Sequence, residues 1–211
     1  GVIGALSWFF LFRRNQTITS VGAAVEGTPM PPLRAVWHAL TQIVIVGLGA
    51  SVGREVAPRE MAAALAAAAA DRLGLCAQDR RIIVACGAGA GLAAVYSIPL
   101  SGAIYTLEVL LVSRSARAVA PALVSSSIAV LLSTGFTRPA FFYSLPPLTP
   151  SLSLTVFGAL VGPLLGAAGW VFRRVVASLG SARPRDWRLL VAMPLCFTLV
   201  GLVSTRVPSV L

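Results

Sequence analysis

The chain has 211 residues, of which 57% are hydrophobic and only 11% are charged, and its formal net charge is +10. Because a soluble domain carries about 25% charged residues, this composition favours an integral membrane protein. All 17 basic residues are arginines, and they lie singly or in pairs at the ends of apolar segments. That distribution excludes the basic face of a nucleic-acid-binding protein and is typical of anchors at the membrane surface.

The residues that usually carry catalysis or hold metals are scarce. Cys76, Cys86 and Cys196 lie far apart without a C-x-x-C pair, which favours reduced thiols. His38 is the only histidine, and no cluster of histidine, cysteine and carboxylate residues accompanies it. We therefore expect no metal ion and no Ser-His-Asp enzyme.

The N-terminal segment, residues 1–12, is hydrophobic but lacks the basic start and cleavage site of a signal peptide. We interpret it as the end of a membrane helix whose beginning is missing. The sequence stops equally abruptly at Leu211, so we expect a fragment. Residues 15–34 are predicted to form a polar loop with a short helix around residues 20–25, and residues 35–52 to form the first complete membrane helix.

A charged segment, Gly53 to Glu60, interrupts the apolar sequence before a second helix predicted at residues 56–73. Pro58 fits the first turn of that helix, where its missing N–H is no loss. Glu55 lies where the free N–H groups and the positive dipole end of the helix collect. One interpretation is an anion site with a carboxylate at its mouth. The other is a solvated turn whose two acids and two arginines neutralise each other, and spacing favours neither.

The middle of the chain continues with a polar loop, residues 71–81, and two apolar runs, residues 82–96 and 98–112. Each run is shorter than the roughly 20 residues that cross a bilayer. Such short, interrupted pairs are typical of transporters whose broken helices meet near the membrane midplane.

After a boundary at Arg114 and Arg117, we expect three more helices in a single domain. These predicted helices span residues 118–133, 152–172 and 189–205, and Pro163 is expected to kink the second. A loop through Pro146, Pro147 and Pro150 and a basic loop at residues 173–188 separate them.

The glycine-rich run from Cys86 to Ala94 contains G-x-G-x-x-A, which could be taken for a dinucleotide-binding motif. A nucleotide fold requires alternating strands and polar helices around the motif, whereas the neighbours here are lipid-compatible helices. Close packing of membrane helices through small residues explains the run better. We therefore expect no cofactor.

The segment from Ser97 to Gly102 joins the two short apolar runs. Ser97 could cap a helix whose first turn contains Pro99, which would aim N–H groups inward at mid-membrane. The alternative is an ordinary tight turn.

Glu108 is the only charge in the second short run. A lone carboxylate at membrane depth is either a functional group or a structural one bonded to a neighbouring helix, and both interpretations stay open.

Together these motifs resemble the CLC family of chloride channels and proton-coupled chloride transporters. The segments that carry the resemblance are Gly53-Arg54-Glu55, the run from Gly87 to Ala94, and Pro99-Leu100-Ser101-Gly102 leading to Glu108. In order and spacing they correspond to the family's GREGP, GAAAGLAAAF and PLAG segments.

The resemblance implies an all-α integral membrane fold of tilted and broken helices, built as two inverted halves in each subunit of a homodimer. Residues 1–211 would form one incomplete transmembrane domain, with most of the first half and the start of the second. Helices 118–133 and 152–172 would face the partner subunit. The expected location is a bacterial plasma membrane.

By the same resemblance, Glu55 is the gating glutamate, which competes with chloride for the anion site. The N–H groups of Val56 and Ala57 would lie beside the anion, and Gly53 and Arg54 would complete its binding segment.

Several positions depart from the family pattern. The glycine after the gate is Val56, and the proline follows one place later. The GSGIP chloride-binding loop is not recognisable at residues 26–29. Proton-coupled members carry two adjacent glutamates where this chain has Glu108 and Val109, so we predict passive anion movement without strict proton exchange.

The leading hypothesis is therefore a chloride (anion) channel or transporter subunit. A proton-coupled fluoride/chloride antiporter is the alternative within the same class. A non-transporting membrane scaffold, with Arg54/Glu55 and Arg59/Glu60 as structural ion pairs, is the alternative from another class, and a membrane enzyme is disfavoured. Anion flux from vesicles of the full-length protein discriminates among them.

Overall fold

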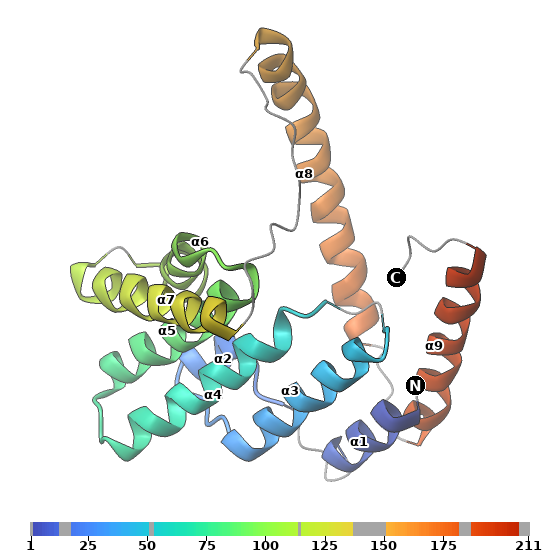
Figure 1. Ribbon diagram of the computed structural model, residues 1–211, viewed down its shortest axis with the longest axis horizontal. Coiled ribbons are helices and arrows are strands. Elements are labelled where there is room, and N and C mark those ends of the chain that lie inside the picture. Colours follow the sequence, from blue (N-terminus) through green and yellow to red (C-terminus); the bar gives the residue numbers. More distant parts are fainter. Residues whose placement is uncertain are drawn as a thin grey trace. The chain divides into compact units, whose positions relative to one another are not determined.

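The computed structural model describes residues 2–12, 18–50, 53–113, 115–136, 151–181 and 187–206, and within these ranges the regular structure is entirely helical (Figure 1). The predicted proline-rich loop at residues 146–150 and the boundary at Arg114 lie outside the described residues. The helices in chain order are α1 (Val2–Phe12), α2 (Val21–Val25), α3 (Pro32–Gly47), α4 (Val56–Arg72), α5 (Ala77–Tyr96), α6 (Pro99–Ile104), the π-helix η1 (Tyr105–Leu111), α7 (Ala116–Phe136), α8 (Leu152–Ser181) and α9 (Arg188–Arg206).

The chain divides into two compact units. Residues 1–139 and 185–211 form the first, and residues 140–184, which include α8, form the second. In the first unit, α5 packs against α4 on one side and against α6, η1 and α7 on others, while α3 packs against α4 and α1 (Figure 1). Helix α4 therefore lies between α3 and α5.

Small side chains make the contact between α4 and α5. Ala63, Ala64 and Ala67 of α4 and Ala85 and Ala88 of α5 are all buried. Side chains of this size let two helix backbones approach closely, which is how helices in lipid gain packing energy.

The glycines of α5 show how close this approach is. A β-carbon at Gly87 would lie 2.8 Å from the Ala62 carbonyl oxygen, and one at Gly91 would lie 2.5 Å from the Pro58 carbonyl oxygen. Either contact would force the helices apart. The prediction that the glycine-rich run serves helix packing is thus confirmed.

The turn between α5 and α6 distinguishes the two interpretations of the segment from Ser97 to Gly102. Ser97 has a left-handed backbone with φ of 56° and ends α5, whereas Ile98 occupies the N-cap position of α6 without a side-chain cap. The Ile98 N–H donates to the Ala93 carbonyl at 3.2 Å. Of the two interpretations, the N-cap at Ser97 is therefore wrong, because that residue closes the preceding helix.

Helix α8 also differs from its prediction, since it continues to Ser181 through the first part of the expected basic loop. Arginine is a good helix former, and the Arg174 guanidinium stacks over the Trp170 ring one turn earlier, 4.1 Å from its centroid. Residues 182–186 of that loop lie outside the described residues.

Two described helices are long and apolar enough to cross a membrane, at Ala116–Phe136 and Leu152–Leu179. Shorter apolar helices occur at Val2–Leu11, Pro99–Leu111 and Leu190–Arg206. Helix α3 begins and ends earlier than predicted, whereas α4 matches its predicted range within one residue.

Candidate functional site

The start of α4 is the centre of the candidate site. Glu55 occupies the N-cap position, with φ of −80° and ψ of −29°, and its side chain does not cap the helix. Val56 and Ala57 supply the first N–H groups, which have no acceptor inside an α-helix. Pro58 follows as the third helical residue and has no N–H to satisfy. The sequence-predicted helix start is confirmed.

The Glu55 carboxylate is bound from α5 instead. The Tyr96 hydroxyl donates to Glu55 Oε1 at 2.5 Å. Tyr96 is the last residue of α5, and its side chain remains partly exposed. The carboxylate is therefore held next to the helix start without occupying its N–H groups.

Gly53 leaves space for this carboxylate. A β-carbon at position 53 would lie 3.0 Å from Glu55 Oε2, tighter than ordinary van der Waals contact. Gly53 and Arg54 are exposed, whereas Ala57 is buried. The predicted anion-binding residues thus form one short segment that leads from the surface into the helix bundle.

Two aromatic residues at this site were missed by the sequence analysis. Besides Tyr96, Tyr105 of η1 contacts α4: its hydroxyl accepts from Arg59 Nη1 at 3.1 Å, and the guanidinium carbon lies 5.7 Å from the ring centroid. The tyrosines lie at positions where α5 ends and η1 begins. A tyrosine at a helix end next to the charged segment could have been named as a candidate from the sequence. Which helix each hydroxyl reaches depends on packing and could not.

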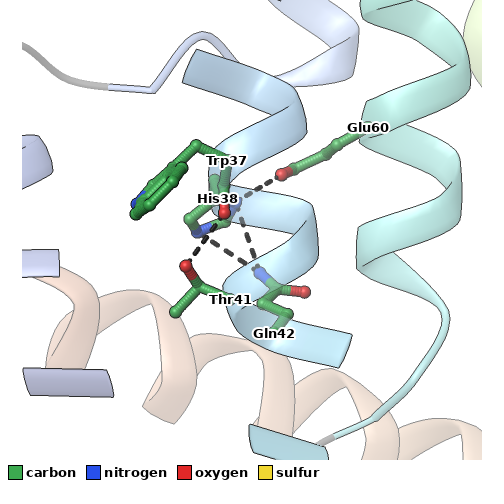
Figure 2. Close-up of polar contacts among 5 residues, drawn as sticks. All are labelled: Trp37, His38, Thr41, Gln42 and Glu60. Atoms are coloured by element: carbon green, nitrogen blue, oxygen red, sulfur yellow. Dashed lines mark hydrogen bonds and ion pairs between the residues drawn. The ribbon is translucent and has the colours of Figure 1, made fainter. Parts of the chain in front are cut away.

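Glu60 lies on the side of α4 that faces α3. Figure 2 shows its carboxylate reaching the imidazole of His38, and Glu60 Oε2 lies 2.8 Å from His38 Nδ1. The scaffold hypothesis pairs Glu60 with Arg59. In the structure, Arg59 contacts Tyr105 of η1 and Glu60 contacts His38 of α3, so the two side chains bind partners on different helices.

Glu108 lies on η1, where its side chain is exposed, and the neighbouring Val109 is 61% exposed. The structure places this predicted carboxylate on a different element from Glu55. Within the described ranges, no three His, Cys, Asp or Glu side chains gather closely enough to hold a metal ion.

Comparison with known proteins identifies related sequences. A family model described as "Voltage gated chloride channel" matches residues 2–211. The chain is 31% identical over 180 residues to the voltage-gated ClC-type chloride channel ClcB of Escherichia coli O81 (strain ED1a) and of Escherichia coli O17:K52:H18 (strain UMN026 / ExPEC). The Shigella boydii serotype 18 protein of the same name shows the same identity. Each alignment covers 81% of this chain but only 41% of the relative, and no solved structure matches.

Proposed function

Because this chain belongs to the voltage-gated chloride channel family, we propose that it is the gate-bearing part of an anion channel or transporter subunit, with chloride as the expected anion. The chain spans 41% of the length of the curated relatives it matches, so the activity belongs to the full-length protein. The observation that carries the proposal is the Glu55 carboxylate beside the uncapped start of α4.

The chemistry of this arrangement is a competition between two anions. The N–H groups of Val56 and Ala57 and the positive dipole end of α4 attract a halide. The ionised Glu55 carboxylate is attracted to the same groups and repels the halide. Protonation of Glu55 removes that charge and leaves the helix start available to the permeating anion.

Tyr96 supplies the other position for the carboxylate. Its hydroxyl donates to Glu55 Oε1 and holds the side chain close to the anion without filling the site. Gly53 accommodates the second carboxylate oxygen, because no side chain competes for that space. Glu55 thereby has a defined resting place from which a small rotation reaches the helix N–H groups.

Anion flux through vesicles of the full-length protein tests this gate. Acidification should increase chloride flux, and Glu55→Gln should give flux that no longer depends on pH over the same range. Glu26→Gln, at an exposed acid that pairs with Arg81, is the matched control and should keep the wild-type pH dependence. Unchanged pH dependence in Glu55→Gln would place the gate elsewhere.

The same vesicles distinguish chloride from fluoride and passive from proton-coupled transport. Val109 cannot hold a proton at the place where proton-coupled members of the family are expected to carry a second glutamate, so anion movement should be passive. Stoichiometric proton uptake driven by an anion gradient would favour the antiporter. Absence of flux of either anion would favour the scaffold.

The proposed setting is a bacterial plasma membrane, with the subunit paired in a homodimer. The two long apolar helices support the membrane location. Helix α7 exposes large apolar side chains such as Val124, Ile128 and Leu131, and α8 exposes its apolar residues along its length. We expect these two helices to contact lipid and the partner subunit, which crosslinking between cysteines placed on α7 of two subunits would test.

A further inference from the structure

We infer that His38, Glu60 and Gln42 form a proton-binding site between α3 and α4, on a side of α4 that differs from the side occupied by Glu55. The inference goes beyond the proposed gate and does not depend on it. Its ligand is a single proton taken from water, and its two states are a neutral and a doubly protonated imidazole.

The first observation is a nearly buried carboxylate next to a nearly buried imidazole. Glu60 Oε2 lies 2.8 Å from His38 Nδ1, and the two side chains are only 13% and 10% exposed. The Trp8 ring of α1 covers the imidazole, with ring centroids 5.9 Å apart. A charge with so little access to water is costly unless a partner compensates it.

The second observation is the position of the Gln42 amide, one turn along α3 (Figure 2). Its nitrogen lies 3.3 Å from His38 Nε2 and 3.4 Å from His38 Nδ1. When the Nδ1–H donates to Glu60, Nε2 is the ring nitrogen that can still accept from this amide. With this tautomer, the site holds a neutral imidazole beside an ionised carboxylate and therefore one negative charge.

The third observation is that Gln42 Oε1 is buried without a hydrogen-bond partner among the described residues. If a proton binds to His38 Nε2, the amide nitrogen can no longer donate there. Rotation of the amide by half a turn brings the unpaired oxygen to the new N–H. The acceptor for the protonated state is thus already in place, and proton binding leaves a pair with no net charge.

The charges of the neighbouring helices do not provide another partner for this imidazole. Helix α1 contributes Ser7 and Trp8 and has no titratable group, and Arg34 of α3 is exposed. The other charged residues of α4 and its cap do not contact the imidazole. Glu55 contacts Tyr96, and Arg59 contacts Tyr105. Asp71 contacts Arg80, and Arg72 is exposed at the end of the helix. Glu60 is therefore the charge that responds to the proton on His38.

The experiment is nitrogen NMR of histidine-labelled full-length protein in lipid nanodiscs, with the His38 signals identified by their loss in His38→Gln. Histidine ordinarily changes charge between about pH 5 and 8. At high pH the signals should show the Nδ1–H tautomer, and acidification should convert them to the doubly protonated form. Glu60→Gln should move this transition to lower pH by about one unit or more, since it removes the opposite charge.

Three further variants test the site and control for disturbed folding. Gln42→Leu keeps the carboxylate but removes the acceptor for Nε2–H, so it should also move the transition to lower pH. Glu60→Asp retains a carboxylate and should restore most of the wild-type behaviour, whereas Glu26→Gln should leave the transition in place.

A His38 side chain that keeps one protonation state from pH 4.5 to 9 would overturn the inference, and so would a transition that Glu60→Gln does not move. The readout is spectroscopic and does not require transport. If Glu55 is not the gate, the flux of Glu55→Gln keeps its pH dependence, but the titration of His38 is unaffected. The two proposals therefore fail separately.

Discussion

Two glutamates, five residues apart, lie before and within α4 in very different surroundings. Glu55 precedes the helix, is partly exposed, and is held by one tyrosine hydroxyl from α5. Glu60 lies inside the helix, is nearly buried, and is held by an imidazole from α3. The comparison teaches that a carboxylate at a helix end can be held by a single hydroxyl and keep access to water, whereas a carboxylate between two helices needs a close partner on the facing helix.

The largest expected effect comes from removing the partner of the buried glutamate. His38→Leu leaves the Glu60 carboxylate without its imidazole, and breaking a buried pair in this way costs about 3–5 kcal/mol. His38→Leu/Glu60→Leu removes both groups and should recover most of that stability. Free energies of unfolding of the full-length protein in mixed detergent measure both. Equal destabilisation by the single and double variants would show that the pair contributes to stability through the packing of its side chains and not through its hydrogen bond and charge.

A second variant tests whether close packing fixes the start of α4. Gly91→Ala places a β-carbon 2.5 Å from the Pro58 carbonyl oxygen, and such overpacking costs about 1–3 kcal/mol. The matched control is Gly22→Ala, because a β-carbon there has no neighbour within 4 Å. The same unfolding measurement should show a loss for position 91 only. Equal stability of the two variants would contradict the packing argument.

A third variant changes the contact of the partly exposed glutamate. Tyr96→Phe removes the hydroxyl that holds the Glu55 carboxylate away from the helix N–H groups, so the carboxylate should occupy the anion site more often. Chloride flux at neutral pH should therefore fall, by up to about tenfold, with little loss of stability. Vesicle flux of the full-length protein at a fixed pH measures the change. Unchanged or increased flux would show that the hydroxyl does not hold the carboxylate out of the anion site.

The smallest effect is expected at the far end of α4, where Asp71 is exposed. The hydrogen bond from Arg80, at 2.6 Å, lowers the pKa of the Asp71 carboxyl below its ordinary value of 3.8. A lowered pKa in the folded state means that this contact stabilises the protein above about pH 4 and is lost as the pH falls further. Asp71→Asn should reduce the free energy of unfolding by less than about 1 kcal/mol at neutral pH, and the difference should vanish in acid.

The sequence predicted the features that depend on neighbours along the chain. The start of α4 at Val56, the place of Glu55 before it, and the short helix after Ser20 all follow from local chemistry, and the structure agrees. Ser97 shows the limit of such reasoning. Its side chain could cap the next helix, but its backbone adopts the left-handed conformation that ends the previous one.

The contacts between helices could not be predicted in the same way. Tyr96 meets Glu55, and Glu60 meets His38, only because α3 and α5 lie on particular sides of α4 at a particular rotation. A shift of one residue turns a helix by about 100° and would separate either pair. The glycine-rich run did predict close packing, since small residues have few other uses between apolar helices.

The winding of η1 has a consequence for comparisons with relatives. A π-helix takes in more residues per turn than an α-helix, so each residue that follows Tyr105 is displaced around the axis from its α-helical position. Deleting one residue from η1 would restore ordinary winding and bring a different side chain to the face that Val109 now occupies. Local winding, as well as residue identity, therefore decides which side chain occupies this face, so two relatives with the same residue at an aligned position can present it to different surroundings.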